Sequence, residues 1–235
     1  MSEQVTIERR FNGPPESGNG GYVCGVVAGL VGGTTEVTLR RPPPLDRPLQ
    51  VARLDNGSVA LRDGETVIAE GAPASLEIDP PAPVSFTEAE EASRSYLGFR
   101  QHIFPTCLVC GTRRTEGDGL RIFPGSIPGL DIVAAPWTPD ASLAGKDNTV
   151  RPEIVWAALD CPSGWAVFGD PSQGRPAVLG RLAARLIAPV RPGERCVVIG
   201  WPRGEEGRKL YSGSALFSHD GELRALARAT WVRIA

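Results

Sequence analysis

Several large classes of protein are excluded by what this chain lacks. Its 235 residues carry a formal charge of −2, and Lys and Arg form no cluster with interleaved aromatics, which argues against nucleic-acid binding. No apolar run approaches the roughly 20 residues of a membrane-spanning helix. The N-terminal residues have neither the basic nor the apolar segment of a signal peptide. We therefore expect a cytoplasmic protein that has no nucleic-acid or membrane partner.

The chain also has too few cysteines and histidines to favour a disulfide scaffold or a Ser-His-Asp catalytic site. The five cysteines are an odd number in apolar contexts, which favours reduced core thiols over a disulfide scaffold. The two histidines are His102 and His219, and His219 lies beside a predicted turn, where we expect it to be exposed. A Ser-His-Asp hydrolase is therefore disfavoured. No Gly-rich segment carries the Lys and Ser/Thr of a phosphate-binding loop.

One short motif raises the question of a metal. Cys107-x2-Cys110, preceded by His102, offers three zinc ligands, whereas a structural zinc site needs four. No second Cys/His pair follows at finger-like spacing, and Cys161 can join only through the fold. The sequence therefore predicts no metal and no cofactor. Cys107 and Cys110 are interpreted as structural thiols, with a zinc site or a redox pair as alternatives.

What the chain does contain is one order of elements that occurs twice. Each half has an apolar helix, then a strand broken at proline, then an Asp-Gly hairpin turn. These features lie at 20–31, Pro44 and Asp63–Gly64 in the first half and at about 152–167, Pro189 and Asp220–Gly221 in the second. A further match pairs Gly57 with Gly213. We interpret the repeated order as the duplication of a whole domain. The alternative is that such breaks and turns recur in any α+β protein.

Alternating apolar residues and turn signals predict the remaining elements. The predicted strands cover 5–11, 36–40, 49–54, 57–62 and 65–78 in the first half, and 119–124, 130–137, 181–188, 195–201, 209–218 and 222–234 in the second. A connector helix is predicted from Thr87 to about Leu97, with Thr87 and Glu90 as its capping box. We therefore expect an N-terminal unit over 1–85, a connector over 86–106 and a C-terminal unit over 107–235.

A helix that is apolar all round and is followed by an antiparallel meander indicates an α+β fold in which a curved sheet wraps a central helix. Two copies in one chain would form an intramolecular pseudo-dimer. The segment Cys107-Leu-Val-Cys-Gly, followed by Gly119-Leu120, resembles the entry to hotdog-fold thioesterases of the phenylacetate-pathway type. In the first half, the Gly20-Gly21-Tyr22 helix and the Arg41-Pro42-Pro43-Pro44 strand resemble the corresponding part of two-domain acyl-CoA thioesterases. Over nearly its whole length, the chain is therefore similar to double-hotdog acyl-CoA thioesterases.

The resemblance also implies which residues form the site. In that family a His-Gly-Gly opens the central helix, and an Asp follows nine residues after the His. Here the second half has Arg151 at the His position and Asp160 nine residues later. The first half has Asn19-Gly20-Gly21, but Ala28 stands where the acid would be. One half thus keeps the glycine entrance and the other keeps the acid.

The family places the thioester between the two units, at the N-terminus of one helix and within reach of an acid from the other. A helix N-terminus offers unpaired N–H groups and a partial positive charge, and glycine allows close approach. We therefore predict that Gly20 and Gly21 contact the oxyanion, that Asn19 orients the carbonyl or a water, and that Asp160 acts as base or nucleophile. The opposite pairing should be inactive, because Pro152 has no N–H to donate.

The same residues also have purely structural explanations, which are alternatives to this hypothesis. Gly20 and Gly21 can serve helix–sheet packing alone, Asp160 can cap a turn near Pro162, and Glu153 can interact with the helix dipole.

The predicted function is hydrolysis of an acyl thioester, with acyl-CoA as substrate. The alternatives are a non-catalytic acyl-thioester-binding or scaffold protein and, less favoured, a dehydratase whose histidine would have to be His102. A homodimer formed through sheet edges is compatible with the sequence but does not follow from it.

Overall fold

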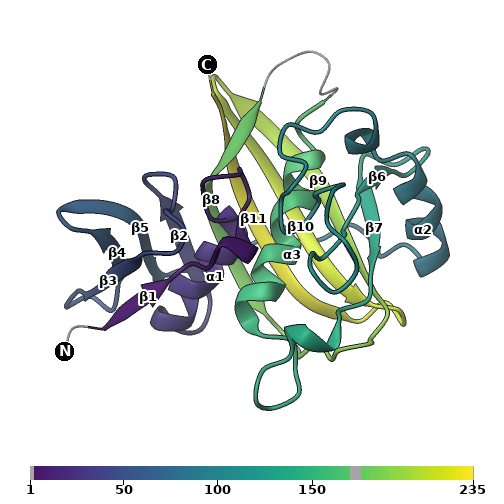
Figure 1. Ribbon diagram of the computed structural model, residues 1–235. Helices are drawn as coiled ribbons and strands as arrows, with labels where there is room; N and C mark the ends of the chain where they lie inside the picture. The colour runs from purple at the N-terminus through teal and green to yellow at the C-terminus, as the bar shows by residue number, and fades with distance from the viewer. Residues whose placement is uncertain (1–2, 170–175, 235) are drawn as a thin grey trace.

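The computed structural model describes residues 3–169 and 176–234 (Figure 1). Within these residues, eleven strands form one antiparallel sheet in the order β1-β3-β4-β5-β2-β8-β11-β10-β9-β7-β6. The strands are β1 (Gln4–Thr6), β2 (Thr35–Leu39), β3 (Pro48–Arg53), β4 (Val59–Asp63), β5 (Thr66–Pro73), β6 (Gly125–Ser126), β7 (Val133–Trp137), β8 (Ala177–Leu186), β9 (Cys196–Glu206), β10 (Lys209–Ser218) and β11 (Leu223–Arg233). The helices are α1 (Gly20–Val31), α2 (Phe86–Arg94) and α3 (Pro152–Trp165), with short 3-10 turns η1 (Arg9–Phe11), η2 (Leu97–Phe99) and η3 (Ala141–Leu143).

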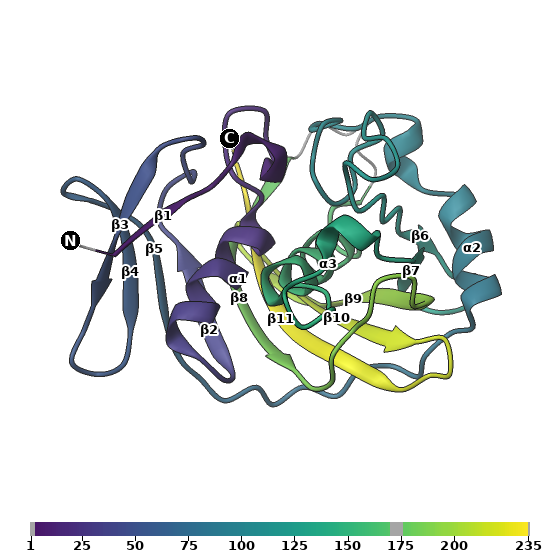
Figure 2. The same cartoon turned by 60° about the horizontal axis from the view of Figure 1, so that its bottom comes forward.

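The two halves of the sheet have the same topology. In the first half, β1, α1 and β2–β5 give the spatial order β1-β3-β4-β5-β2, and in the second, β7, α3 and β8–β11 give β7-β9-β10-β11-β8. The equivalent strands β2 and β8 pair antiparallel, with Thr35 opposite Ala184, so the sheet runs without a break from one half into the other. The central helices α1 and α3 lie side by side on its concave face (Figure 2).

The hairpin turns support the duplication and correct one of its matches. Asp63–Gly64 joins β4 to β5 and Asp220–Gly221 joins β10 to β11, so these two turns are equivalent. Gly57 lies in the β3–β4 turn, whereas Gly213 lies inside β10, so pairing these two was wrong. The counterpart of Gly57 is Gly207 between β9 and β10, and both have positive φ, 77° and 58°.

The crossing of α1 and α3 depends on glycine. A Cβ on Gly21 would lie 2.4 Å from the Asp160 Cβ, and one on Gly25 would lie 2.5 Å from the Glu153 Cα. Both glycines are on one face of α1, four residues apart, and this face is where α3 makes its closest approach. The helices can therefore cross closely only because no side chain separates them.

Separate from the core around α1 and α3, an apolar cluster covers the outer face of the C-terminal half of the sheet. Ala89 and Ala92 of α2 pack there against side chains of β7 and β9, and Leu76 from the segment after β5 joins them. Helix α2 therefore lies on the side of the sheet opposite α3, as Figure 1 shows. Among the described residues, no helix has the length and apolarity that crossing a bilayer requires.

Two strand predictions were wrong. The predicted strand over 119–124 is an irregular segment, and only the two-residue strand β6 follows it. Its apolar residues Leu120 and Ile122 are buried in the core. Their N–H groups bond to the carbonyls of Leu108 and Val109 and not to a neighbouring strand. The predicted strand over 5–11 likewise ends at Thr6 and continues as η1.

The capping box of α2 is formed by Ser85 and Glu88 and not by the predicted Thr87 and Glu90. The Ser85 hydroxyl accepts a hydrogen bond from the Glu88 N–H at 3.2 Å, and the Glu88 carboxylate accepts from the Ser85 N–H at 2.7 Å. The sequence holds the same Ser/Thr-x-x-Glu pattern at both positions, two residues apart. The helix begins at Phe86, so only the earlier pair flanks its N-terminus.

Candidate active site

Asn19 is the N-cap of α1 and is buried at the contact between the two halves. Its Oδ1 accepts the Tyr22 N–H at 2.9 Å, which satisfies one of the unpaired donors of the first helical turn. The cap fixes the side chain, so its amide nitrogen must point the other way. That nitrogen donates to Asp160 Oδ2 at 2.9 Å, 141 residues further along the chain.

Asp160 comes from α3 and receives two hydrogen bonds from α1. Its Oδ2 accepts the Asn19 Nδ2 hydrogen bond and also the Gly21 N–H, at 2.9 Å each. Its Oδ1 is buried and has no hydrogen-bond partner among the described residues. Burial raises the pKa of Asp160 to about 7, although the hydrogen bonds from Gly21 and Asn19 favour the ionised form. The carboxylate is thus held rigidly by one oxygen while the other is unsatisfied.

This arrangement changes the roles expected of the two glycines. The Gly21 N–H is bound to Asp160, so it is not available to a substrate oxygen in this conformation. Gly20 lies at the cavity wall, and a Cβ there would lie 2.9 Å from Leu179 Cδ2. No acceptor for the Gly20 N–H is found among the described residues. Gly20 is therefore the remaining candidate for an oxyanion donor.

A cavity of about 340 Å³ opens beside Asn19, Gly20 and Asp160. Its walls come from the N-terminus of α1, the C-terminal half of α3, the start of β8, the segment 102–110 and the residues after β2. Most of the lining is apolar, including Phe104, Trp165, Phe168, Leu179 and Trp231. The site is therefore a pocket of the kind that binds apolar groups and presents a few polar atoms.

Two arginines lie at the exposed rim of this cavity. Arg40 forms an ion pair with Glu70 at 2.7 Å. Arg41 is exposed and has no ion-pair partner among the described residues. A free guanidinium at the mouth of an apolar pocket suits an anionic part of a ligand that remains outside.

The opposite pairing has different groups at the N-terminus of α3. Arg151 is the N-cap of α3 but makes no side-chain capping hydrogen bond, and Pro152 occupies the first helical position without an N–H. Glu153 forms an ion pair with Arg151 at 3.5 Å, and Ala28 is buried. This end of α3 lacks both a glycine entrance and an opposing acid.

Three thiols converge beside Asp160, and only two of them were candidates from spacing. The sulfur atoms of Cys107, Cys110 and Cys161 lie within 4.8 Å of one another. Cys107 Sγ is 3.7 Å from Cys161 Sγ and 3.8 Å from Asn19 Nδ2. Hydrogen bonds from the Cys110 and Cys161 thiols hold the pKa of Cys107 well below its usual range. Sequence spacing alone could not show that Cys161 lies beside Cys107 and Cys110, because Cys161 is on α3, far along the chain from the 107–110 loop.

The histidines differ in their relation to the site. His102 lines the cavity, and its Nδ1 accepts the Phe104 N–H at 3.0 Å. Its Nε2 is buried without a partner among the described residues. His219 is exposed, as predicted, and lies beside Asp220.

Solved structures resemble this chain over almost its whole length. A TesB protein of Mycobacterium avium subspecies paratuberculosis is 13% identical with a TM-score of 0.60, and the match covers 99% of this chain and 92% of that one. A candidate thioesterase II of Thermobifida fusca is 16% identical with a TM-score of 0.62, over the same 99% and 92%. A hot dog fold protein of unknown function from Alicyclobacillus acidocaldarius is 9% identical with a TM-score of 0.60, again over 99% and 92%.

The chain is a double hotdog. Its two units repeat one topology and pack as an intramolecular pseudo-dimer, which confirms the α+β fold that the motifs implied. No protein-family model matches the chain, and no curated protein matches it in sequence. The likeness to solved structures is therefore one of fold, and the activity of this double hotdog has to be argued from its own site.

Proposed function

We propose that this double hotdog hydrolyses acyl thioesters, and that acyl-coenzyme A is its substrate class. The observation that carries the proposal is the environment of Asp160. One carboxylate oxygen is fixed by Asn19 and the Gly21 N–H from the other unit, while Oδ1 is buried without a partner among the described residues. The residue lines an apolar cavity next to the Gly20 N–H at the N-terminus of α1.

In the proposed reaction, Oδ1 of ionised Asp160 accepts a proton from a water molecule whose oxygen attacks the thioester carbonyl carbon. The carbonyl oxygen becomes an oxyanion next to the Gly20 N–H, where the dipole of α1 also favours negative charge. The tetrahedral intermediate then breaks its C–S bond, and the leaving thiolate takes the proton from Asp160. A carboxylic acid and a free thiol are released, and the carboxylate is regenerated.

The remaining residues of the cavity support this substrate class. Apolar side chains such as Phe104, Trp165 and Leu179 suit an acyl group. Arg41 at the rim can pair with a phosphate of the coenzyme, because guanidinium binds phosphate in bidentate fashion. Asn19 acts by orienting Asp160, since its amide nitrogen already donates to that carboxylate.

The Asp160→Asn variant tests the proposal with little change of shape, because the amide oxygen can still accept from Asn19 and Gly21. A lost general base is expected to lower kcat by about 10²–10⁴-fold. Glu153→Gln is the matched control, because Glu153 lies at the same α1–α3 crossing, beside Gly25, but outside the cavity, and it should retain activity. Free coenzyme A should be measured after chromatography, so that the protein's own five free thiols do not contribute to a thiol assay.

Three outcomes distinguish general-base catalysis by Asp160, nucleophilic catalysis by Asp160 and ligand binding without catalysis. Unchanged turnover in Asp160→Asn would refute the assignment of the base. If acyl-CoA raises the Tm of the wild-type protein but no thiol is released, the protein is a non-catalytic binder. Label in the Asp160 carboxyl group after a single turnover in ¹⁸O-labelled water would identify Asp160 as the nucleophile, because general-base catalysis puts the label into the product acid only.

One observation favours a second candidate, an acyl-thioester dehydratase. Such a reaction needs a histidine together with an acid, and His102 lines the same cavity as Asp160. Because Nδ1 accepts the Phe104 N–H, the proton of neutral His102 lies on Nε2, which could act as a proton donor. Interconversion of 3-hydroxyacyl and enoyl thioesters without thiol release, lost in His102→Gln, would favour this candidate over hydrolysis.

A further inference from the structure

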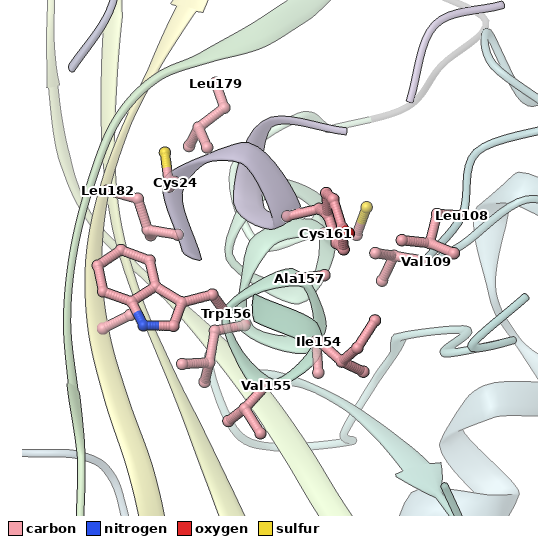
Figure 3. Packing of buried hydrophobic residues seen from close by; sticks show 14 of the residues in the cluster. Cys24, Leu108, Val109, Ile154, Val155, Trp156, Ala157, Cys161, Leu179 and Leu182 are labelled. Atoms are coloured by element: carbon pink, nitrogen blue, oxygen red, sulfur yellow. The ribbon is translucent and has the colours of Figure 1, made fainter. Parts of the chain in front are cut away.

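The three thiols beside the cavity have no role in the proposed hydrolysis. Cys107, Cys110 and Cys161 are 4%, 3% and 6% exposed, and all three line the cavity. They come from two segments: the loop 107–110 and helix α3. Figure 3 shows Cys161 on the part of α3 that faces Leu108 and Val109 of this loop.

Packing alone explains the burial of a cysteine but not the convergence of three. Cys24 and Cys196 are as deeply buried, yet neither belongs to a group of three metal-ligating side chains among the described residues. A disulfide would join only two of the three sulfur atoms, and its S–S length of about 2.05 Å is far below the 3.7 Å between Cys107 and Cys161. Hydrogen bonds between thiols fit this spacing, and so does a metal ion that is bound by all three sulfur atoms.

We propose that Cys107, Cys110 and Cys161 bind a zinc ion through their thiolates. A Zn–S distance of about 2.3 Å and a tetrahedral angle place two ligand sulfur atoms about 3.8 Å apart. The Cys107–Cys161 separation of 3.7 Å matches this edge. All three sulfur atoms lie within 4.8 Å of one another. Tetrahedral coordination of one zinc ion therefore requires them to move by about 1 Å or less.

The fourth position of this zinc site faces the cavity and not a protein side chain. His102 is the nearest candidate by sequence, but its Nε2 does not belong to the cluster. Its Nδ1 accepts the Phe104 N–H, so Nε2 of the neutral ring carries the proton and cannot bind a metal. Three protein ligands with one open position are the arrangement of zinc sites that bind an exogenous ligand.

A zinc ion here would also connect the two sides of the candidate active site. It would join the 107–110 loop to α3 directly beside Asp160. Asn19 lies next to the same cluster, with its Nδ2 at 3.8 Å from Cys107 Sγ. The site would therefore fix the relative positions of the loop and the helix that enclose the cavity.

Metal analysis of the protein purified without chelators or an affinity tag that binds metals tests the proposal. We expect one zinc per chain by mass spectrometry. After exchange with Co²⁺, we expect the thiolate-to-cobalt charge-transfer bands and the intense visible bands of a tetrahedral site. Cys161→Ala should weaken binding more than about 100-fold, since even residues that only support a ligand contribute 10–100-fold. Cys196→Ala is the matched control and should bind normally.

The design keeps metal binding separate from catalysis and from folding. Metal content and cobalt spectra do not depend on turnover, so they can fail while hydrolysis succeeds, or the reverse. Circular dichroism checks that Cys161→Ala is folded, and Cys107→Ala serves as a second variant. Three freely titrating thiols without bound Zn²⁺ or Co²⁺ in reduced wild-type protein would overturn the proposal. Loss of metal in His102→Ala would overturn the open fourth position.

Discussion

Replacing Gly21 by alanine tests whether the crossing of α1 and α3 builds the active site. The new Cβ would lie 2.4 Å from the Asp160 Cβ and 2.8 Å from the Trp156 carbonyl oxygen. Neither atom is the free end of a flexible side chain, so the two helices would have to move apart. This movement would also stretch the 2.9 Å hydrogen bond from the Gly21 N–H to Asp160.

The expected loss of stability follows from three contributions. Overpacking costs about 1–3 kcal/mol, and weakening a hydrogen bond to a charged acceptor costs about 1.5–3 kcal/mol. The higher helix propensity of alanine offsets about 1 kcal/mol. A net destabilisation of about 3 kcal/mol lowers the Tm of a chain of this length by about 6–12 °C. Thermal unfolding followed by circular dichroism measures this shift.

The same helix provides two control variants. Gly29 has open space around it, so Gly29→Ala should raise stability by up to about 1 kcal/mol. At Gly25 a Cβ would lie 2.5 Å from the Glu153 Cα, so Gly25→Ala should also destabilise the protein but leave the hydrogen bonds of Asp160 in place. Hydrolysis measured where all variants are folded should fall at least tenfold in Gly21→Ala only.

Two results would refute this reasoning. If Gly21→Ala unfolded at the same temperature as Gly29→Ala, α1 and α3 would not approach each other as closely as described. If Gly21→Ala and Gly25→Ala lost the same activity, the loss would reflect helix packing in general and not the Gly21–Asp160 hydrogen bond.

Four further substitutions test the caps of α1 and α2. Asn19→Ser keeps an N-cap oxygen but loses the amide donor to Asp160, so both hydrolysis and the Tm should fall; Asn19→Ala also loses the cap and should be less stable than Asn19→Ser by about 1 kcal/mol, and equal Tm values of these two variants would contradict the cap. Ser85→Ala should lower the free energy of unfolding by about 1 kcal/mol, and Thr87→Ala should change it little; the reverse order would contradict the observed capping box. Hydrogen bonds from Ser85 lower the pKa of Glu88, so the capping box stabilises α2 above the unfolded-state pKa of about 4.3 and less as pH falls. The difference between wild type and Ser85→Ala should therefore shrink in acid.

Local features of the sequence determined the elements of the fold. The helix over 20–31 was predicted with the bounds of α1, because its glycine entrance and continuous apolar run are local signals. The two Asp-Gly turns were placed correctly for the same reason, since positive φ at glycine defines such a turn within four residues. The segment 119–124 was predicted wrongly, because burial in a packed loop and burial in a sheet produce the same apolar pattern.

The site was only partly predictable. The resemblance to hotdog thioesterases singled out Asn19 and Asp160, and the structure brings these two side chains into contact. Their roles remain proposals. That the Gly21 N–H donates to Asp160, and is therefore unavailable to a substrate, could not be predicted, because it depends on how closely two helices approach.

The sequence by itself determined that one domain occurs twice and that the two copies differ, because turns, helix boundaries and residue identities are local properties. The tertiary structure alone decided how the copies meet. The pairing of β2 with β8 joins their sheets, and the close crossing at Gly21 and Gly25 brings α1 against α3. The same crossing and the packing of the 107–110 loop bring Cys161 to the other two thiols. These contacts join residues far apart in the chain, so they depend on shape complementarity between surfaces, which no local pattern specifies.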